Sequence, residues 1–150
     1  MKKRNNSGFT LIELLVVMAI IGILTTIAAS SFISVQLKAS DARRKHDLEQ
    51  IQKALEMYYN DKGRYPVAGY VISGTFQDAP NNVVYMQKVP TDPRTGATYF
   101  YESNVNGVFY RLYATLENSK DPVIATSGCQ AGCIQGGVSY NYRVWSPNAP

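Results

Sequence analysis

One long uncharged stretch near the N-terminus limits what this chain can fold into. Residues 14–37 contain no Asp, Glu, Lys, Arg or His over 24 consecutive positions. A helix needs about 20 apolar residues to cross the hydrocarbon core of a bilayer, so this stretch is long enough to span a membrane once. The rest of the 150-residue chain is polar and contains many Tyr, Gly, Asn and Pro residues, which predicts one small water-exposed domain after the helix.

The residues before this stretch match a secretory signal only in part. Residues 1–8 read MKKRNNSG, which is basic and polar like the start of such a signal. A secretory signal has its small-residue cleavage site after the apolar segment, whereas Ser7 and Gly8 precede it. Cleavage at Gly8 therefore leaves the apolar helix on the mature protein. The formal net charge is +4, but three positive charges lie in residues 2–4, so the +1 that remains gives no indication of nucleic-acid binding.

Residues 8–24, GFTLIELLVVMAIIGIL, resemble the processing site and N-terminal helix of type IV pilins and type II secretion pseudopilins. The resemblance implies that a membrane-embedded prepilin peptidase cuts between Gly8 and Phe9, and that Phe9 becomes an N-methylated N-terminus. Many members of the family have a helix-kinking proline where this chain has Ser30. How ordered the helix is around Ser30 therefore stays open.

Glu13 is a carboxylate at the start of the apolar segment. A buried carboxylate needs a positive or hydrogen-bonding partner. The resemblance implies that this partner is the free amine of Phe9 in a neighbouring subunit. Such a contact favours the correct axial register, because a shifted register buries both charges alone. The alternative interpretation is a glutamate that snorkels at a membrane surface.

The rest of the chain predicts an α+β fold. A stripe of residues three or four positions apart indicates that the helix continues to about residue 59: Ala42, Lys45, Leu48, Ile51, Leu55 and Tyr58. Strands are expected at residues 97–102, 108–116 and 138–145. A short hairpin within residues 67–76 and an extended segment at residues 83–86 are weaker candidates.

The predicted architecture is pilin-like, with a long N-terminal helix packed on a small antiparallel sheet. Residues 1–8 are the predicted leader peptide, and residues 9–37 the transmembrane and assembly helix. Residues 38–150 are the predicted globular domain, which includes the second half of the long helix, at about residues 38–59.

Cys129 and Cys133 lie close together in the segment GCQAGC. A disulfide between them is the favoured interpretation for an exported domain, and free thiols are the alternative. A metal site is disfavoured, because it needs more ligands and the single histidine, His46, lies in the helical segment.

Asp92 lies between prolines and a glycine, where a turn-forming aspartate is the favoured interpretation. Some pseudopilins bind calcium in a loop of the C-terminal domain, so the resemblance implies calcium as the alternative. Besides Asp92, the oxygen ligands of the calcium ion would come from Asp78, Asn81 or Glu117. We expect no other cofactor.

A basic cluster covers residues 43–46, RRKH. It predicts a solvated helix face near lipid headgroups, with contact to DNA or to an acidic subunit surface as the alternative. The sequence contains no nucleic-acid motif, no G-x-S-x-G, no phosphate loop and no paired metal motif. We therefore do not expect an enzyme.

These features predict a structural subunit of a type IV pilus or a type II secretion pseudopilus. By resemblance, its partners are other pilin or pseudopilin subunits, the prepilin peptidase, an assembly platform membrane protein and an assembly ATPase. The precursor is expected to span the cytoplasmic membrane once, with its C-terminal domain outside the cytoplasm, and then to enter an extracytoplasmic or cell-surface filament. A minor pilin that acts in DNA uptake or adhesion is the alternative, and an unprocessed single-span anchor is a third.

Overall fold

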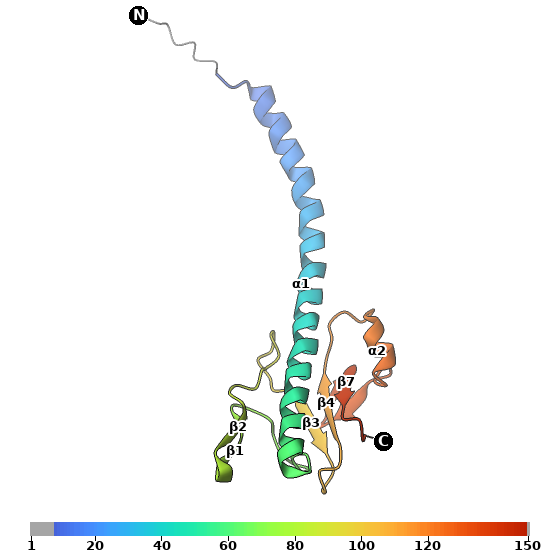
Figure 1. The fold of residues 1–150 in the computed structure, drawn as a ribbon. Coiled ribbons are helices and arrows are strands. Elements are labelled where there is room, and N and C mark those ends of the chain that lie inside the picture. The colour runs from blue at the N-terminus through green and yellow to red at the C-terminus, as the bar shows by residue number, and fades with distance from the viewer. Residues whose placement is uncertain (1–7, 150) are drawn as a thin grey trace, which may run out of the picture. The chain divides into compact units, whose positions relative to one another are not determined.

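The fold is given by a computed structural model that describes residues 8–149, except for the side chains of residues 27–31. The elements are α1 (Leu11–Lys62), β1 (Phe76–Asp78), the 3-10 helix η1 (Ala79–Asn81), β2 (Val83–Met86), β3 (Phe100–Ser103), β4 (Tyr110–Ala114), α2 (Pro122–Thr126), β5 (Cys133–Gln135), β6 (Val138–Tyr140) and β7 (Tyr142–Trp145) (Figure 1). A long helix followed by short antiparallel strands confirms the predicted α+β class. Contacts divide the chain into two units, residues up to Gln36 and residues from Leu37.

The first unit is the N-terminal part of α1, and a capping box fixes where it begins. The N–H and the hydroxyl of Thr10 both donate to Glu13 Oε2, at 2.8 and 2.7 Å, and the N–H of Glu13 donates to Thr10 Oγ1 at 3.3 Å. These bonds satisfy donors of the first turn that have no partner within a helix. The helix therefore begins at Leu11, not at Phe9.

No helix in the described part of the chain is both long and apolar enough to cross a membrane. The transmembrane span predicted for residues 9–37 stays a prediction.

The second unit packs the C-terminal half of α1 against strands. Leu48, Ile51 and Leu55 lie on the inner face of α1, and each is at most 1% exposed. Their spacing of three and four residues places them on one side of the helix, as predicted. The helix ends at Lys62, beyond the predicted residue 59, where Gly63 adopts a φ of +67°. This left-handed conformation is typical of the residue after a helix.

The predicted stripe is wrong on the N-terminal side of Leu48. Ala42 is exposed and Lys45 is only half-buried, whereas Asp41, Arg44 and Asp47 are buried. The inner face of α1 therefore changes from apolar to charged. These charged residues are buried because later segments of the chain supply partners for them.

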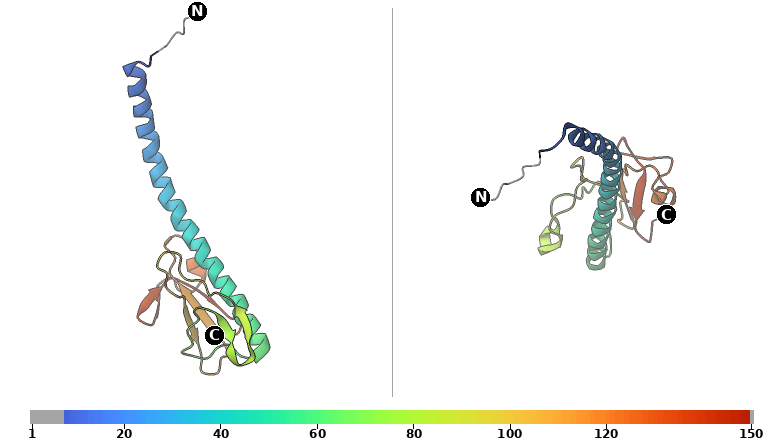
Figure 2. Two further views of the ribbon diagram at one scale, coloured as in Figure 1. Left: turned by 90° about the vertical axis from the view of Figure 1, so that its left-hand side faces the viewer. Right: turned by 90° about the horizontal axis from the view of Figure 1, so that it is seen from above.

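Three strands form the main sheet in the order β3-β4-β7, and both pairs are antiparallel. In the central strand, Leu112 is opposite Tyr101 on one side and Val144 on the other. Two further hairpins, β1–β2 and β5–β6, form separate two-stranded sheets. The β1–β2 hairpin and the three-stranded sheet lie on opposite sides of the C-terminal half of α1 (Figures 1 and 2).

The turn after α1 is joined to the turn between β3 and β4. The N–H of Tyr65 donates to the carbonyl oxygen of Gly107 at 2.8 Å, and the hydroxyl of Tyr101 donates to the carbonyl oxygen of Pro66 at 2.6 Å. The rings of Tyr65 and Tyr110 meet edge to face with centroids 4.7 Å apart. These contacts fix the end of α1 on the sheet.

Two of the predicted strands are present in shortened form as β3 and β4. The single strand predicted for residues 138–145 is wrong, because the chain divides at Asn141 into β6 and β7, which belong to different sheets. The side chain of Asn141 accepts from the N–H of Leu116 at 2.7 Å and donates to its carbonyl oxygen at 2.8 Å. The side chain of Asn141 therefore bonds to backbone that belongs neither to the β5–β6 pair nor to the β4–β7 pair, and strand pairing is interrupted at this residue.

The hairpin predicted within residues 67–76 is also wrong. Only Phe76 of that range lies in a strand, and β1 pairs instead with β2, the extended segment predicted at residues 83–86. The chain reverses through η1, and Asn82 follows it with a φ of 57°. Asparagine tolerates this left-handed conformation better than most residues do. α2 and β5 were not predicted.

Candidate assembly site

The first part of α1 presents apolar side chains on every side. From Leu11 to Leu24, its large apolar residues range from 47% exposed at Val17 to 89% exposed at Leu11. A helix that is apolar all round is normally covered by protein or lipid, and an exposed apolar surface of this kind marks an interaction site. Among the residues that the structure describes, none covers this surface.

Gly8 and Phe9 lie just before α1, outside regular secondary structure. Both are exposed, Phe9 by 85%. A Cβ atom at Gly8 would have no heavy atom within 4 Å, so the described residues 8–149 do not crowd this position. Cleavage at this bond and methylation of Phe9 stay predictions.

Glu13 is exposed, and its carboxylate accepts both donors of Thr10. Thr10 directly follows Phe9 in the chain, so the capping box holds the carboxylate near the residue that is predicted to carry the new amine. Sequence reasoning missed this pair, although its signature is present as T-x-x-E at residues 10–13. The contact of Glu13 with a neighbouring subunit stays a prediction.

Asp92 belongs to the second unit, where it forms a turn. Its Oδ1 accepts from the N–H groups of Arg94 and Thr95, each at 2.9 Å. Local hydrogen bonds from a side chain to the backbone one turn ahead are the usual role of aspartate in a turn. Arg44, from α1, also donates to this carboxylate.

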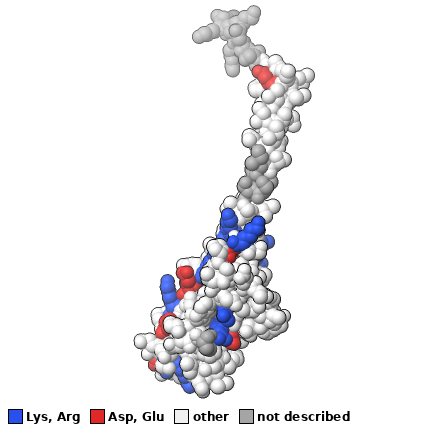
Figure 3. Space-filling view, turned by 90° about the vertical axis from the view of Figure 1, so that its right-hand side faces the viewer, with Lys and Arg blue, Asp and Glu red and all other residues white. Residues whose placement is uncertain are grey.

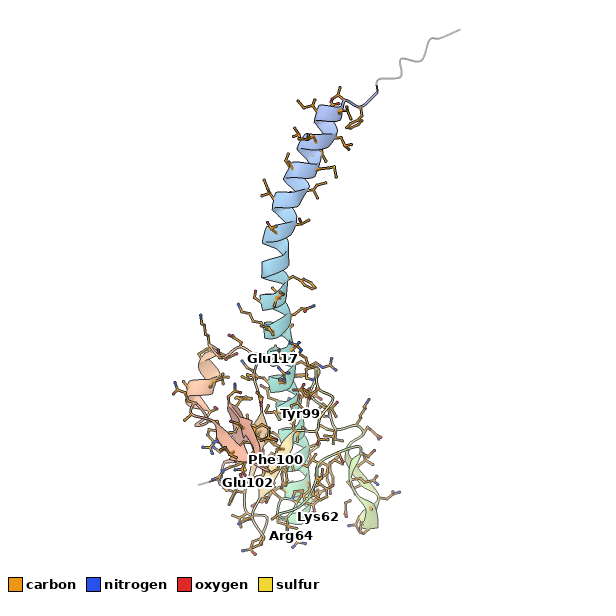
Figure 4. All side chains as sticks on the ribbon, turned by 180° about the vertical axis from the view of Figure 1, so that it is seen from behind. Lys62, Arg64, Tyr99, Phe100, Glu102 and Glu117 are labelled. Carbon is orange, nitrogen blue, oxygen red and sulfur yellow. A yellow bond between two sulfur atoms is a disulfide. The ribbon has the colours of Figure 1, made fainter. Side chains whose placement is uncertain are left out.

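Arg44 is 2% exposed and lies among three carboxylates. Its Nη1 donates to Asp41 Oδ1 at 2.8 Å, and its Nη2 donates to Glu117 Oε1 at 2.6 Å. Its Nε and Nη2 donate to the two oxygens of Asp92, at 2.6 and 3.2 Å. Figure 4 shows Glu117 beside α1. We call Asp41, Arg44, Asp92 and Glu117 the Arg44 network.

Within the Arg44 network, hydrogen bonds favour the charged forms of Arg44 and Asp92. Burial alone disfavours the charged form of Arg44, but the hydrogen bonds that it donates to Asp92, Glu117 and Asp41 outweigh burial and raise the pKa of Arg44. Burial alone would likewise raise the pKa of Asp92. Hydrogen bonds from Arg44 and from the two turn N–H groups outweigh burial and hold the pKa of Asp92 well below its usual range.

The basic cluster at residues 43–46 is not the continuous solvated face that was predicted. Arg44 is buried in its network, and Lys45 Nζ forms an ion pair with Asp121 at 2.5 Å. Arg43 and His46 remain exposed. Lys and Arg side chains are interspersed with Asp and Glu on the face that Figure 3 shows. The alternative in which this cluster binds DNA therefore loses two of its cations to partners within the chain.

Cys129 and Cys133 are joined by a disulfide with their Cα atoms 5.1 Å apart. This separation is ordinary for a disulfide. Cys129 is buried and Cys133 is half-buried, and the bond closes the turn between α2 and β5. Within residues 8–149 there is no free cysteine.

Comparison with known proteins gave two matches to family models. Residues 3–29 match the model described as the prokaryotic N-terminal methylation motif. Residues 31–120, more than half of the chain, match the model described as type II secretion system (T2SS), protein G. The first match contains the predicted processing residues, and the second contains the Arg44 network.

Several curated proteins are similar to the chain. The type II secretion system core protein G of Pseudomonas aeruginosa is 32% identical over 129 residues, which cover 81% of this chain and 90% of that protein. Its namesake from Aeromonas hydrophila is 33% identical over 101 residues, 62% of this chain and 71% of that protein. The type IV major pilin protein PilA of Myxococcus xanthus is 43% identical over 60 residues, 40% of this chain and 27% of that protein. No solved structure is a significant match.

Proposed function

Because the chain belongs to the type II secretion system protein G family, we propose that it is a structural subunit of a pseudopilus that polymerises through the first part of α1. The family consists of structural subunits, not enzymes. The observation that carries the proposal is the uncovered apolar surface of Leu11–Leu24, with one carboxylate at its capped start. A lone anchor in lipid gains nothing from that carboxylate, whereas a subunit that stacks on its neighbours does.

In this proposal the precursor is held in the cytoplasmic membrane by residues 9–37. Prepilin peptidase removes residues 1–8, and Phe9 becomes the N-methylated N-terminus. The matched methylation motif over residues 3–29 supports these steps. The assembly platform and its ATPase then supply the work that moves the helix from lipid into a filament outside the cytoplasm.

Glu13 sets the register between subunits in this proposal. In the single chain its carboxylate is satisfied by Thr10. Inside a filament, neighbouring apolar helices exclude water, so the carboxylate needs a cation. The amine of Phe9 in the adjacent subunit is that cation. A subunit shifted along the axis leaves both charges buried without a partner, which is strongly unfavourable.

Two substitutions at Glu13 separate charge from capping. Glu13→Gln keeps an acceptor for the capping box, which takes either Glu or Gln, but removes the charge. Glu13→Val removes both, and Ile12→Val is the matched apolar control. We expect all three proteins to be inserted and processed. We expect filament yield after shearing to fall on the order of tenfold for both Glu13 variants and to stay at the wild-type level for Ile12→Val.

The outcome for Glu13→Gln decides between the two roles. A normal filament yield from Glu13→Gln, together with a low yield from Glu13→Val, would assign Glu13 to helix capping and refute the ion pair. A normal yield from both variants would remove Glu13 from assembly altogether.

A further inference from the structure

The oxygens suggested for a calcium site around Asp92 do not come together as a ligand set. Asp78 accepts from the amide of Asn81 and forms an ion pair with Lys62, so both of these suggested ligands are engaged elsewhere. Of the suggested ligands, Glu117 shares a partner with Asp92, and that partner is a cation, Arg44. Over the residues with described side chains, no group of three or more His, Cys, Asp or Glu is placed to hold a metal ion.

Nitrogen donors already occupy every carboxylate oxygen in the Arg44 network. Asp41 Oδ1 accepts from Arg44 and from the N–H of Glu117, and Asp41 Oδ2 accepts from the N–H of Asn118 at 2.8 Å. Both oxygens of Asp92 accept from Arg44. Glu117 Oε1 accepts from Arg44, and Glu117 Oε2 accepts from Arg94.

Calcium needs six to eight oxygen ligands whose lone pairs are free to face the ion. All six carboxylate oxygens of Asp41, Asp92 and Glu117 instead face N–H donors. A calcium ion could enter only after Arg44 had left, and departure of a buried guanidinium breaks four hydrogen bonds. The residues present therefore do not fit calcium.

We infer that the Arg44 guanidinium takes the place of a bound cation, and that the second unit folds and keeps its loops ordered without calcium. The planar guanidinium can donate in several directions at once, which a carboxylate cluster from three segments requires. The inference goes beyond the proposed function, since a subunit can assemble whether or not its domain needs an ion.

The network connects three segments that are far apart in sequence. Asp41 and Arg44 lie in α1, Asp92 lies 48 residues from Arg44, and Glu117 lies 73 residues from it. Asp41 also holds the backbone after β4 through the N–H groups of Glu117 and Asn118, at 2.9 and 2.8 Å. Without a cation, the buried carboxylate of Asp41 and the half-buried carboxylate of Asp92 would repel each other and Glu117. The turn at Asp92 and the segment at Glu117 and Asn118 are then expected to open.

The test measures thermal unfolding of the full chain in a mild detergent, with either excess EGTA or millimolar calcium chloride. For the wild type we expect the same Tm in both solutions. Arg44→Gln is expected to lower Tm on the order of 10 °C in EGTA, because it leaves the buried Asp41 and the partly buried Asp92 and Glu117 without their shared cation. The exposed neighbour variant Arg43→Gln is the matched control and is expected to match the wild type.

Hydrogen exchange at the amides of Glu117 and Asn118 reports the loop directly. We expect both amides to be protected in the wild type in EGTA, and to exchange at least about tenfold faster in Arg44→Lys, which keeps the charge but loses the planar donors. This variant keeps the test valid if Arg44→Gln does not fold. A wild-type Tm that rises with calcium, or unprotected loop amides in EGTA, would overturn the inference. Neither result would affect processing or filament yield, so the proposed function is tested separately.

Discussion

Replacing Gly107 by alanine tests how the end of α1 is fixed on the sheet. Gly107 lies in the turn between β3 and β4 with a φ of +64°, and its carbonyl oxygen accepts the N–H of Tyr65 at 2.8 Å. A Cβ atom at this position would lie 2.2 Å from the carbonyl oxygen of Tyr65 and 3.2 Å from its carbon and nitrogen. The obstacle is backbone, so no side-chain rotation relieves the contact.

The cost of Gly107→Ala has two parts. A left-handed conformation costs an L-residue about 1–2 kcal/mol. Relief of the contact must move the two turns apart, which loses the hydrogen bond from Tyr65, about 0.5–1.5 kcal/mol, and disturbs the packing of its buried ring. We therefore expect a loss of about 3 kcal/mol in the free energy of unfolding, or a fall in Tm of about 6–12 °C for a chain of this size.

Gly96→Ala is the matched control. Gly96 has a φ of +70°, but a Cβ atom there meets nothing within 4 Å, so only the conformational cost of about 1–2 kcal/mol applies. Thermal unfolding of the full chain in detergent, followed by circular dichroism, measures both variants. Equal losses of Tm for the two variants would refute the argument, because the contact with Tyr65 would then carry no energy.

Three further predictions concern the second unit. Leu48→Ala is expected to cost about 2–5 kcal/mol in denaturant unfolding, because it opens a cavity in the core, whereas Met57→Ala on the exposed face should stay within about 0.5 kcal/mol of the wild type. Because the pKa of Asp92 is lower in the folded than in the unfolded chain, its contribution is complete above pH 4 and is lost as the pH falls further. The unfolding free energy of the wild type should therefore decline below about pH 4, by up to about 1.4 kcal/mol per pH unit from this group, and that of Asp92→Asn should decline less. Replacing Cys129 and Cys133 together by serine should cost about 2 kcal/mol in the unfolding free energy measured without reductant, because the disulfide closes a very short loop.

The sequence was most informative where interactions are local. The uncharged run and the stripe of Leu48, Ile51 and Leu55 predicted one continuous helix, because a helix face shows in the sequence as apolar residues three or four positions apart. The sequence also contained the capping box at Thr10 and Glu13, which a search for T-x-x-E finds. Its effect, a helix that begins two residues later than expected, follows from local hydrogen bonds alone.

The Arg44 network could not be predicted, because its members are brought together by the fold. Arg44 sits in a run of basic residues, which usually indicates a solvated helix face. Its burial depends on carboxylates 48 and 73 residues away, and no local pattern indicates those partners. Asn141 is a similar case, since its bonds to Leu116 divide one alternating segment into two strands of different sheets.

The intact mass of the protein extracted from membranes shows whether the chain is processed at Gly8 as a pseudopilin is. In cells with an active prepilin peptidase, the account predicts a chain that lacks residues 1–8 and carries one methyl group on Phe9. In cells without the peptidase, it predicts the unmodified precursor. A chain that still begins at Met1 when the peptidase is active would contradict the account.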